Sequence, residues 1–222
     1  MARMARIVIP GLPHHVMQRG NRGQQVFFTA GDSLHYRTLL AEGCRAHGVE
    51  CWAYCLMPDH VHLILVPSDE GGLRRALGEA HRRYTRHINR RNGWTGHLWQ
   101  GRFASCVLDE AGLLEAARYV ERAPVREGFC LRPEHWRWSS ARAHLTGCDD
   151  PLVVAGPLRE RCPQWAEYLA QGVPGTTARR LERHVRTGRP MGSEAFVRAL
   201  EVRTGRRLRR RKPGPKPKNT AT

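Results

Sequence analysis

Two apolar runs, rich in aromatic and β-branched residues, occupy positions 49–56 and 60–66 of this 222-residue chain. The short segment Met57-Pro58-Asp59 separates them, and its Pro and Asp favour a tight turn. Runs of this length and composition, joined by so short a connection, predict two neighbouring strands. The chain is therefore expected to fold around a sheet that contains this pair.

Further elements are predicted on both sides of the strand pair. Turn signals bracket residues 14–19, which predict a strand, and residues 31–47 carry apolar positions at helical spacing. Later in the chain, residues 73–93 predict an amphipathic basic helix and residues 102–108 a strand. Asp109 is a suitable N-cap for a helix that ends before Pro124. The order β-α-β-β-α-β predicts an α+β, ferredoxin-like fold, an antiparallel sheet with helices on one face.

The C-terminal part of the chain is organised differently from the principal domain, residues 1–146. Gly and Pro interrupt residues 147–176, which predict an irregular connector. Helices at 177–186 and 193–203, joined by a turn, predict a small helical DNA-binding extension over residues 177–205. Residues 206–222 are rich in Arg, Lys and Pro and are expected to form a disordered basic arm.

The charge of the chain predicts a polyanionic partner. Lys and Arg outnumber Asp and Glu by 37 to 20, which gives a net charge of +17, and such an excess favours nucleic acid. The seven cysteines form no Cys-x-x-Cys pair, and no signal peptide or apolar run of membrane-spanning length is visible. We therefore expect a cytoplasmic protein, monomeric or homodimeric, that makes no membrane contact.

Two histidines open the second apolar run. Residues two apart on a strand share one face, so His60 and His62 are expected to project together, about 7 Å apart. Imidazole is a good ligand for divalent transition metals. A His-x-His pair is also common by chance, and the competing interpretation is two half-exposed histidines at a strand end. Their alternation with Val61, Leu63 and Leu65, on a central strand of the expected sheet, favours the metal site.

Several ordered sequence blocks surround the histidine pair and accompany a tyrosine, Tyr119, on the last predicted helix of the principal domain. The blocks are Arg6-Ile-Val-Ile-Pro-Gly-Leu-Pro-His-His-Val16, Gln18-Arg-Gly-Asn21, Tyr54-Cys-Leu-Met-Pro-Asp-His-Val-His62, Trp99-Gln-Gly-Arg-Phe103, Arg118-Tyr-Val-Glu-Arg-Ala-Pro-Val-Arg126 and Trp138-Ser-Ser-Ala141. In these blocks the chain resembles the REP-associated tyrosine transposases, which are single-tyrosine His-hydrophobic-His (HUH), IS200-like transposases.

The resemblance implies a catalytic domain over residues 1–146 and a function. A divalent metal, Mg²⁺ or Mn²⁺, would be held by His60 and His62 at the scissile phosphate of single-stranded DNA. Tyr119 would attack that phosphate, displace a 3′-hydroxyl and form a 5′-phosphotyrosine. The enzyme would nick and rejoin hairpin-forming palindromic repeats, the REP elements, in transposition or recombination, and would be associated with the nucleoid.

One position departs from the family pattern. Family members usually carry an amide side chain one helical turn after the tyrosine, where this chain has Ala123. Alanine cannot ligate a metal, so the third ligand would be water, the substrate or Glu115, which lies one turn before Tyr119. The departure keeps an alternative open, a catalytically silent hairpin-binding protein or regulator with the transposase fold. A third, weaker interpretation is an unrelated zinc hydrolase.

Residue type and neighbouring sequence suggest DNA contact or packing for several other residues. Trp99 could stack on a base, but core packing is the more common role of tryptophan. His14 and His15 fit solvated surface better than DNA contact. The candidate DNA-binding residues outside the catalytic blocks are Arg82, Arg83, Arg86, Arg90, Arg207, Arg209, Arg210, Arg211 and Lys212.

Overall fold

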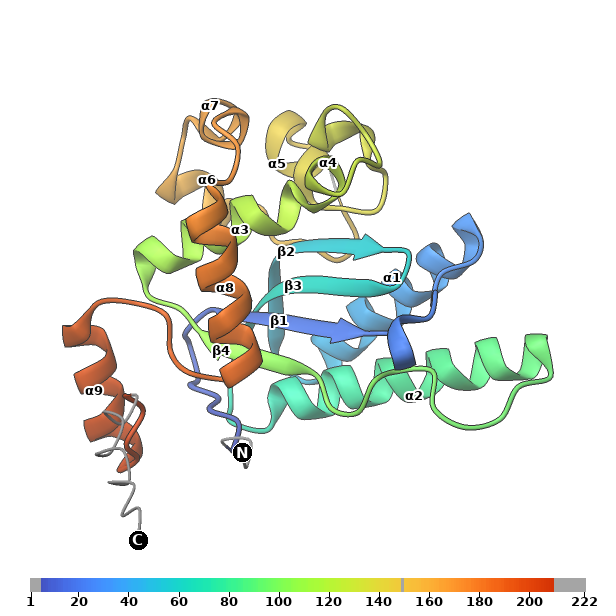
Figure 1. Cartoon of the computed structure of the whole chain (residues 1–222), viewed down its shortest axis with the longest axis horizontal. Helices are drawn as coiled ribbons and strands as arrows, with labels where there is room; N and C mark the ends of the chain where they lie inside the picture. The colour runs from blue at the N-terminus through green and yellow to red at the C-terminus, as the bar shows by residue number, and fades with distance from the viewer. Residues whose placement is uncertain (1–4, 149, 210–222) are drawn as a thin grey trace, which may run out of the picture.

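A four-stranded antiparallel sheet forms the centre of the computed structural model, which describes residues 5–148 and 150–209 (Figure 1). The strands are β1 (His14–Arg19), β2 (Val49–Met57), β3 (His60–Pro67) and β4 (Ala104–Val107). Their spatial order is β2-β3-β1-β4, in which every neighbouring pair is antiparallel. This is the ferredoxin-like order, so the predicted α+β fold is confirmed.

The two helices of the β-α-β-β-α-β unit, α1 (Ala30–Ala46) and α2 (Gly72–Asn92), cover one face of the sheet. Alternate residues of β3 point toward them, and Val61, Leu63 and Leu65 are completely buried in this core. A capping box at Thr29 fixes the start of α1, since its hydroxyl accepts from the Asp32 amide and the Asp32 carboxylate accepts in return. The predicted placement of these two helices is therefore confirmed.

The opposite face of the sheet is covered by helices that follow this unit. α3 (Glu110–Glu121) begins at the predicted N-cap Asp109, whose carboxylate accepts from the Gly112 amide at 2.8 Å. α8 (Gly175–Thr187) lies beside it, with Leu181 and Val185 buried in the same core. The sheet is thus enclosed on both faces, and the His60 face lies under α3 and α8.

The remaining elements are short or lie at the periphery. They are the 3₁₀ turns η1 (Asn21–Gly23) and η2 (Pro133–His135), and the helices α4 (Ala123–Arg126), α5 (Ala141–Thr146), α6 (Gly156–Arg161), α7 (Trp165–Ala170) and α9 (Glu194–Thr204). The sequence of residues 147–176 predicted an irregular connector, but this segment contains α6 and α7. Their Leu158 and Trp165 are buried against the α3 side of the core, and this burial stabilises helices that local pattern alone does not reveal.

The segment after α8 returns to the sheet and joins α9 to it. The Met191 amide donates to Val107 at 2.9 Å, and the Asp109 amide donates to the Met191 carbonyl at 3.0 Å. Arg206–Arg209, the first residues of the expected basic arm, pack against the molecule, because Leu208 is buried and Arg209 pairs with Glu201 at 2.8 Å. The rest of the expected arm lies outside the described residues. Among the described residues, none of the helices combines the length and apolarity that crossing a membrane requires.

His14 and His15 are buried, so the expectation of solvated surface for this pair was wrong. β1 lies between β3 and β4, and both histidines therefore face packed layers. His14 Nε2 accepts from the Ile9 amide at 3.1 Å and Nδ1 donates to the Leu12 carbonyl at 2.8 Å, which satisfies the neutral ring completely. Burial lowers the pKa of His14 from 6.5 to about 4.

This pKa shift predicts acid sensitivity. The unfolded chain binds the His14 proton more readily than the folded chain does, so the free energy of unfolding is highest above pH 6.5 and falls toward pH 4. The slope from one such histidine is about 1.4 kcal/mol per pH unit. Urea unfolding at several pH values between 7 and 4 gives the free energy of unfolding at each pH. In His14→Gln, whose amide can replace both hydrogen bonds, this free energy should fall less steeply with decreasing pH, by this amount per pH unit. The same pH dependence of the unfolding free energy in the two proteins would contradict the lowered pKa of His14.

Candidate active site

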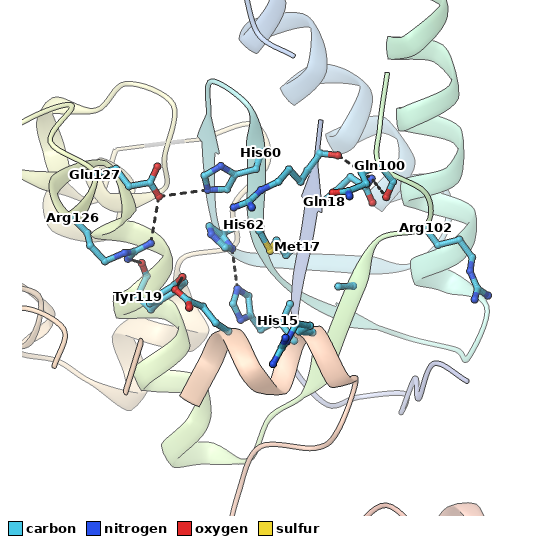
Figure 2. Close-up of a pocket in the computed structure, with 15 residues that line it drawn as sticks. His15, Met17, Gln18, His60, His62, Gln100, Arg102, Tyr119, Arg126 and Glu127 are labelled. Atoms are coloured by element: carbon cyan, nitrogen blue, oxygen red, sulfur yellow. Dashed lines mark hydrogen bonds and ion pairs between the residues drawn. The ribbon is translucent and has the colours of Figure 1, made fainter. Parts of the chain in front are cut away.

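His60, His62 and Tyr119 converge on one cavity of about 830 Å³ on the α3 side of the sheet (Figure 2). The two histidines come from β3, and β2 and β1 pair with β3 on either side. The same alternation that buries Val61 and Leu63 under α1 and α2 turns both imidazoles to the other face. Their ring centroids are 4.9 Å apart, and the Tyr119 ring lies 5.3 Å from that of His62. The structure thus brings together the three residues that the sequence singled out.

Each imidazole of the pair is held by one ring nitrogen. His60 Nδ1 is 2.6 Å from Asp59 Oδ1, and His62 Nδ1 is 3.2 Å from His15 Nε2. A histidine that donates from Nδ1 to a second group leaves the lone pair of Nε2 free for a metal. Burial lowers the pKa of His62 well below its ordinary value, with the charges of neighbouring groups adding to the effect. A neutral ring of this kind is the form that ligates a cation.

The Tyr119 side chain extends from the last turn of α3 and is 3% exposed. Its hydroxyl donates to Glu182 Oε1 at 3.2 Å, and the guanidinium of Arg126 lies 3.9 Å from the ring centroid. The pKa of the phenol is raised to about 12, mainly by burial, with Arg126 lowering it and Glu182 adding to the rise. The tyrosine is therefore a neutral phenol at pH 7, with a carboxylate at its hydroxyl and a cation over its ring.

Glu115, one of the three possible third ligands, is not among the residues that line the cavity. Glu115 forms an ion pair with Arg180 of α8 instead of approaching the histidines. The carboxylate that reaches the pair from the cavity is that of Glu127, whose Oε1 lies 3.6 Å from His60 Nε2 and also 3.6 Å from Arg126 Nη2 (Figure 2). In the described parts of the chain, no three His, Cys, Asp or Glu side chains are already arranged as a complete ligand set.

Sequence reasoning missed Glu127, Arg126, Glu182 and His15 as site residues. Ala123 is completely buried and starts α4, so the chain makes a further helical turn after α3 in spite of Pro124. Proline is accepted at the start of a helix, and that extra turn carries Arg126 to Tyr119 and Glu127 to His60. The spacing of eight residues between Tyr119 and Glu127, about two helical turns, was the available signal.

The cavity wall is rich in cations. Arg19, Arg102, Arg126 and Arg186 line it, against the carboxylates of Glu127 and Glu182. A second cavity of about 600 Å³, lined by Arg82 and Arg74, shares Arg102 with the first. A phosphodiester chain would be attracted to this surface.

The predicted DNA-binding arginines lie in different surroundings. On α2, Arg86 and Arg90 are exposed, whereas Arg83 pairs with Glu42 at 2.6 Å. Trp99 is 6% exposed and packs against Tyr36 and Tyr84, in agreement with the favoured packing role. Arg207 is exposed near the end of the described chain. The candidates that lie outside the described residues are Arg210, Arg211 and Lys212.

Comparison with known proteins places this fold and site in one class. The profile of the family described as "Transposase IS200 like" matches residues 9–123, which include both histidines and the tyrosine. Because that match spans more than half of the chain, the chain belongs to the IS200-like transposase family, whose members are DNA-processing enzymes. The resemblance inferred from the sequence blocks is confirmed at this level.

One curated protein and two solved structures are similar to this chain. A Haemophilus influenzae protein named as a candidate REP-associated tyrosine transposase is 24% identical over 116 residues, 47% of this chain and 66%, just under two thirds, of its own length. A solved REP-associated tyrosine transposase bound to a REP hairpin has a TM-score of 0.57 at 19% identity, covering 68% of this chain and 90% of that one. A candidate transposase from Deinococcus radiodurans R1 has a TM-score of 0.39 at 23% identity, over 55% of this chain and 97% of that one.

Proposed function

We propose that this protein is a metal-dependent transposase-like enzyme that nicks and rejoins single-stranded DNA at hairpin-forming repeats. The observation that carries the proposal is the convergence of His60, His62 and Tyr119 on one cation-lined cavity. The name of the hairpin-bound relative and the net charge of +17 support a hairpin DNA substrate. Action on chromosomal DNA would place the protein in the cytoplasm with the nucleoid.

The residues present fit a divalent metal at the histidine pair. His60 and His62 each have one ring nitrogen engaged by a neighbour, which orients the other toward the cavity. A bound Mg²⁺ or Mn²⁺ would polarise the scissile phosphate and offset its developing charge. Arg126, over the Tyr119 ring, would stabilise the phenolate as it forms, and the arginines of the wall would hold the neighbouring phosphates.

The covalent step would exchange one phosphodiester for another. The Tyr119 oxygen would form a bond to phosphorus while the bond from phosphorus to O3′ breaks, which leaves a 5′-phosphotyrosine and a free 3′ end. Because the phosphotyrosine is itself a phosphodiester, no external energy source is needed to reverse the step. The 3′-hydroxyl of a second strand could attack the phosphotyrosine and complete a strand transfer. Residues 1–146 would form the catalytic domain, with residues 177–205 as an extension that also lines the cavity through Glu182, Val185 and Arg186.

A labelled hairpin with single-stranded flanks, incubated with Mn²⁺, tests the proposal. We expect a protein–DNA adduct that survives a denaturing gel, is absent after chelation of the metal and is lost in His60→Ala. The second candidate is a hairpin-binding protein without activity, which Ala123 and the incomplete ligand set favour. Tight hairpin binding with no adduct, for a panel of hairpins and both metals, would reject the enzyme and leave that candidate.

The third ligand gives a separate prediction. Glu127 contacts the metal-facing nitrogen of His60, so Glu127→Gln should weaken Mn²⁺ binding by at least about 10-fold, the effect that even outer-shell partners have. Glu115→Gln is the matched control, because its carboxylate pairs with Arg180 and should not affect affinity. Calorimetric titration of the protein without DNA measures both. Loss of affinity in Glu115→Gln alone would favour Glu115 over Glu127 as the third ligand.

A further inference from the structure

The Tyr119 hydroxyl has to lose its proton for the proposed attack, and the cavity offers one contacting acceptor. The hydroxyl donates to Glu182 Oε1 at 3.2 Å, and it makes no other hydrogen bond among the described residues. The rings of His15 and His62 approach the tyrosine ring edge-on, with centroids 5.8 and 5.3 Å away, and Arg126 covers its face. A carboxylate at hydrogen-bond distance from a phenol is the geometry of a general base.

Glu182 is held in this position by the packing of α8. Leu181 and Val185, on either side of it in the helix, are buried against the sheet and α3. Two residues before Glu182, the exposed Arg180 pairs with Glu115 of α3, so α8 contacts the helix that carries the tyrosine directly. Glu182 itself is exposed at the mouth of the cavity, where it can exchange a proton with water.

We propose that Glu182 is a catalytic residue, the general base that accepts the Tyr119 proton during DNA cleavage and returns it when the phosphotyrosine is resolved. The inference rests on the proposed function. In the forward step the O–H bond of Tyr119 breaks and its proton moves to Glu182 as the oxygen–phosphorus bond forms. The bond to O3′ breaks with its electron pair, and O3′ takes a proton from water. In the reverse step the 3′-hydroxyl of the incoming strand gives its proton to water and its oxygen bonds to phosphorus, while the tyrosine oxygen leaves phosphorus and regains its proton from Glu182.

This residue belongs to a part of the chain that the family profile does not match. The profile ends at residue 123, and α8 begins at Gly175. The extension would therefore supply a chemical group to the active site and would act as more than a DNA-binding appendage. The same contact also allows an opposite role, in which Glu182 holds the tyrosine back, and the rate of adduct formation separates the two.

Single-turnover adduct formation at saturating hairpin and Mn²⁺ is the test. Glu182→Gln keeps the size and the hydrogen-bond acceptor but cannot take the proton, so the rate should fall by about 100-fold or more. Hairpin affinity should not weaken. Glu194→Gln is the matched control, because it removes the same charge from an exposed site on α9 and should leave the rate unchanged.

A second variant separates proton transfer from a structural role. Replacing Tyr119 by a trifluorotyrosine, a more acidic phenol, should restore most of the lost rate in Glu182→Gln, because that phenol needs less help from a base. A Glu182→Gln protein as fast as or faster than wild type, or one that the acidic phenol does not rescue, would overturn the proposal. A wild type that forms no adduct would instead reject the proposed function, and this inference with it.

Discussion

Tyr119→Phe is expected to abolish the covalent DNA adduct while leaving the fold and hairpin binding intact. The substitution removes the nucleophilic oxygen and keeps the ring, whose contacts with His15, His62 and Arg126 do not need the hydroxyl. Loss of a covalent nucleophile costs at least about 10⁴-fold in rate. The free energy of unfolding should change by about 1 kcal/mol, since one partly buried hydrogen bond to Glu182 is lost.

Two measurements check this expectation. Denaturing gels give the amount of adduct, and hairpin titration followed by fluorescence anisotropy gives the affinity. A Tyr119→Phe protein that forms no adduct but binds the hairpin with wild-type affinity would locate the defect in the chemical step. An adduct formed by Tyr119→Phe at the wild-type rate would mean that another residue is the nucleophile.

Glu121→Ala is expected to cause the largest loss of stability. The Glu121 carboxylate is completely buried and accepts hydrogen bonds from three donors: His144 Nδ1 at 2.5 Å, Ser140 Oγ at 2.5 Å and Trp165 Nε1 at 2.9 Å. Its removal leaves those donors without their acceptor in a region that excludes water. Breaking such a network costs about 3–5 kcal/mol. Denaturant unfolding measures the effect.

Glu121→Ala also tests whether the buried network positions Tyr119 in the candidate active site. It lies two residues after Tyr119 on α3 and joins that helix to α5 and α7, so its loss should also disturb the tyrosine. Glu110→Ala is the matched control, since Glu110 is an exposed residue of the same helix that pairs with Arg161 at 2.9 Å and should contribute no more than about 1 kcal/mol. Equal losses in the two variants would show that the buried network does not stabilise the fold.

Local pattern predicted the fold and the centre of the site for identifiable reasons. The alternation of β3 separates His60 and His62 from Val61 and Leu63, and a period of two determines which side chains share a face. Asp109 capped the helix that carries Tyr119 as predicted, because capping depends on neighbouring backbone amides alone. These features are encoded within a few residues.

The parts that sequence did not predict depend on distant contacts. Glu182 reaches Tyr119 across 63 positions of the chain, and Arg180 of the same distant helix forms an ion pair with Glu115. Trp165 and Leu158 give the segment 147–176 its helices by packing on the α3 side of the core. His14 and His15 were misjudged because polarity suggested the surface, whereas a central strand buries both of its faces.

Mapping the covalent link tests the central claim most directly. A hairpin strand labelled on the 3′ side of the nick is incubated with the wild-type protein and Mn²⁺, the adduct is digested with nuclease and protease, and the modified peptide is sequenced by mass spectrometry. The account predicts that the 3′-side label stays with the protein and that the nucleotide remnant is attached through a 5′-phosphate to Tyr119. A remnant on any other residue, or a label from the 5′ side of the nick on the protein, would contradict it.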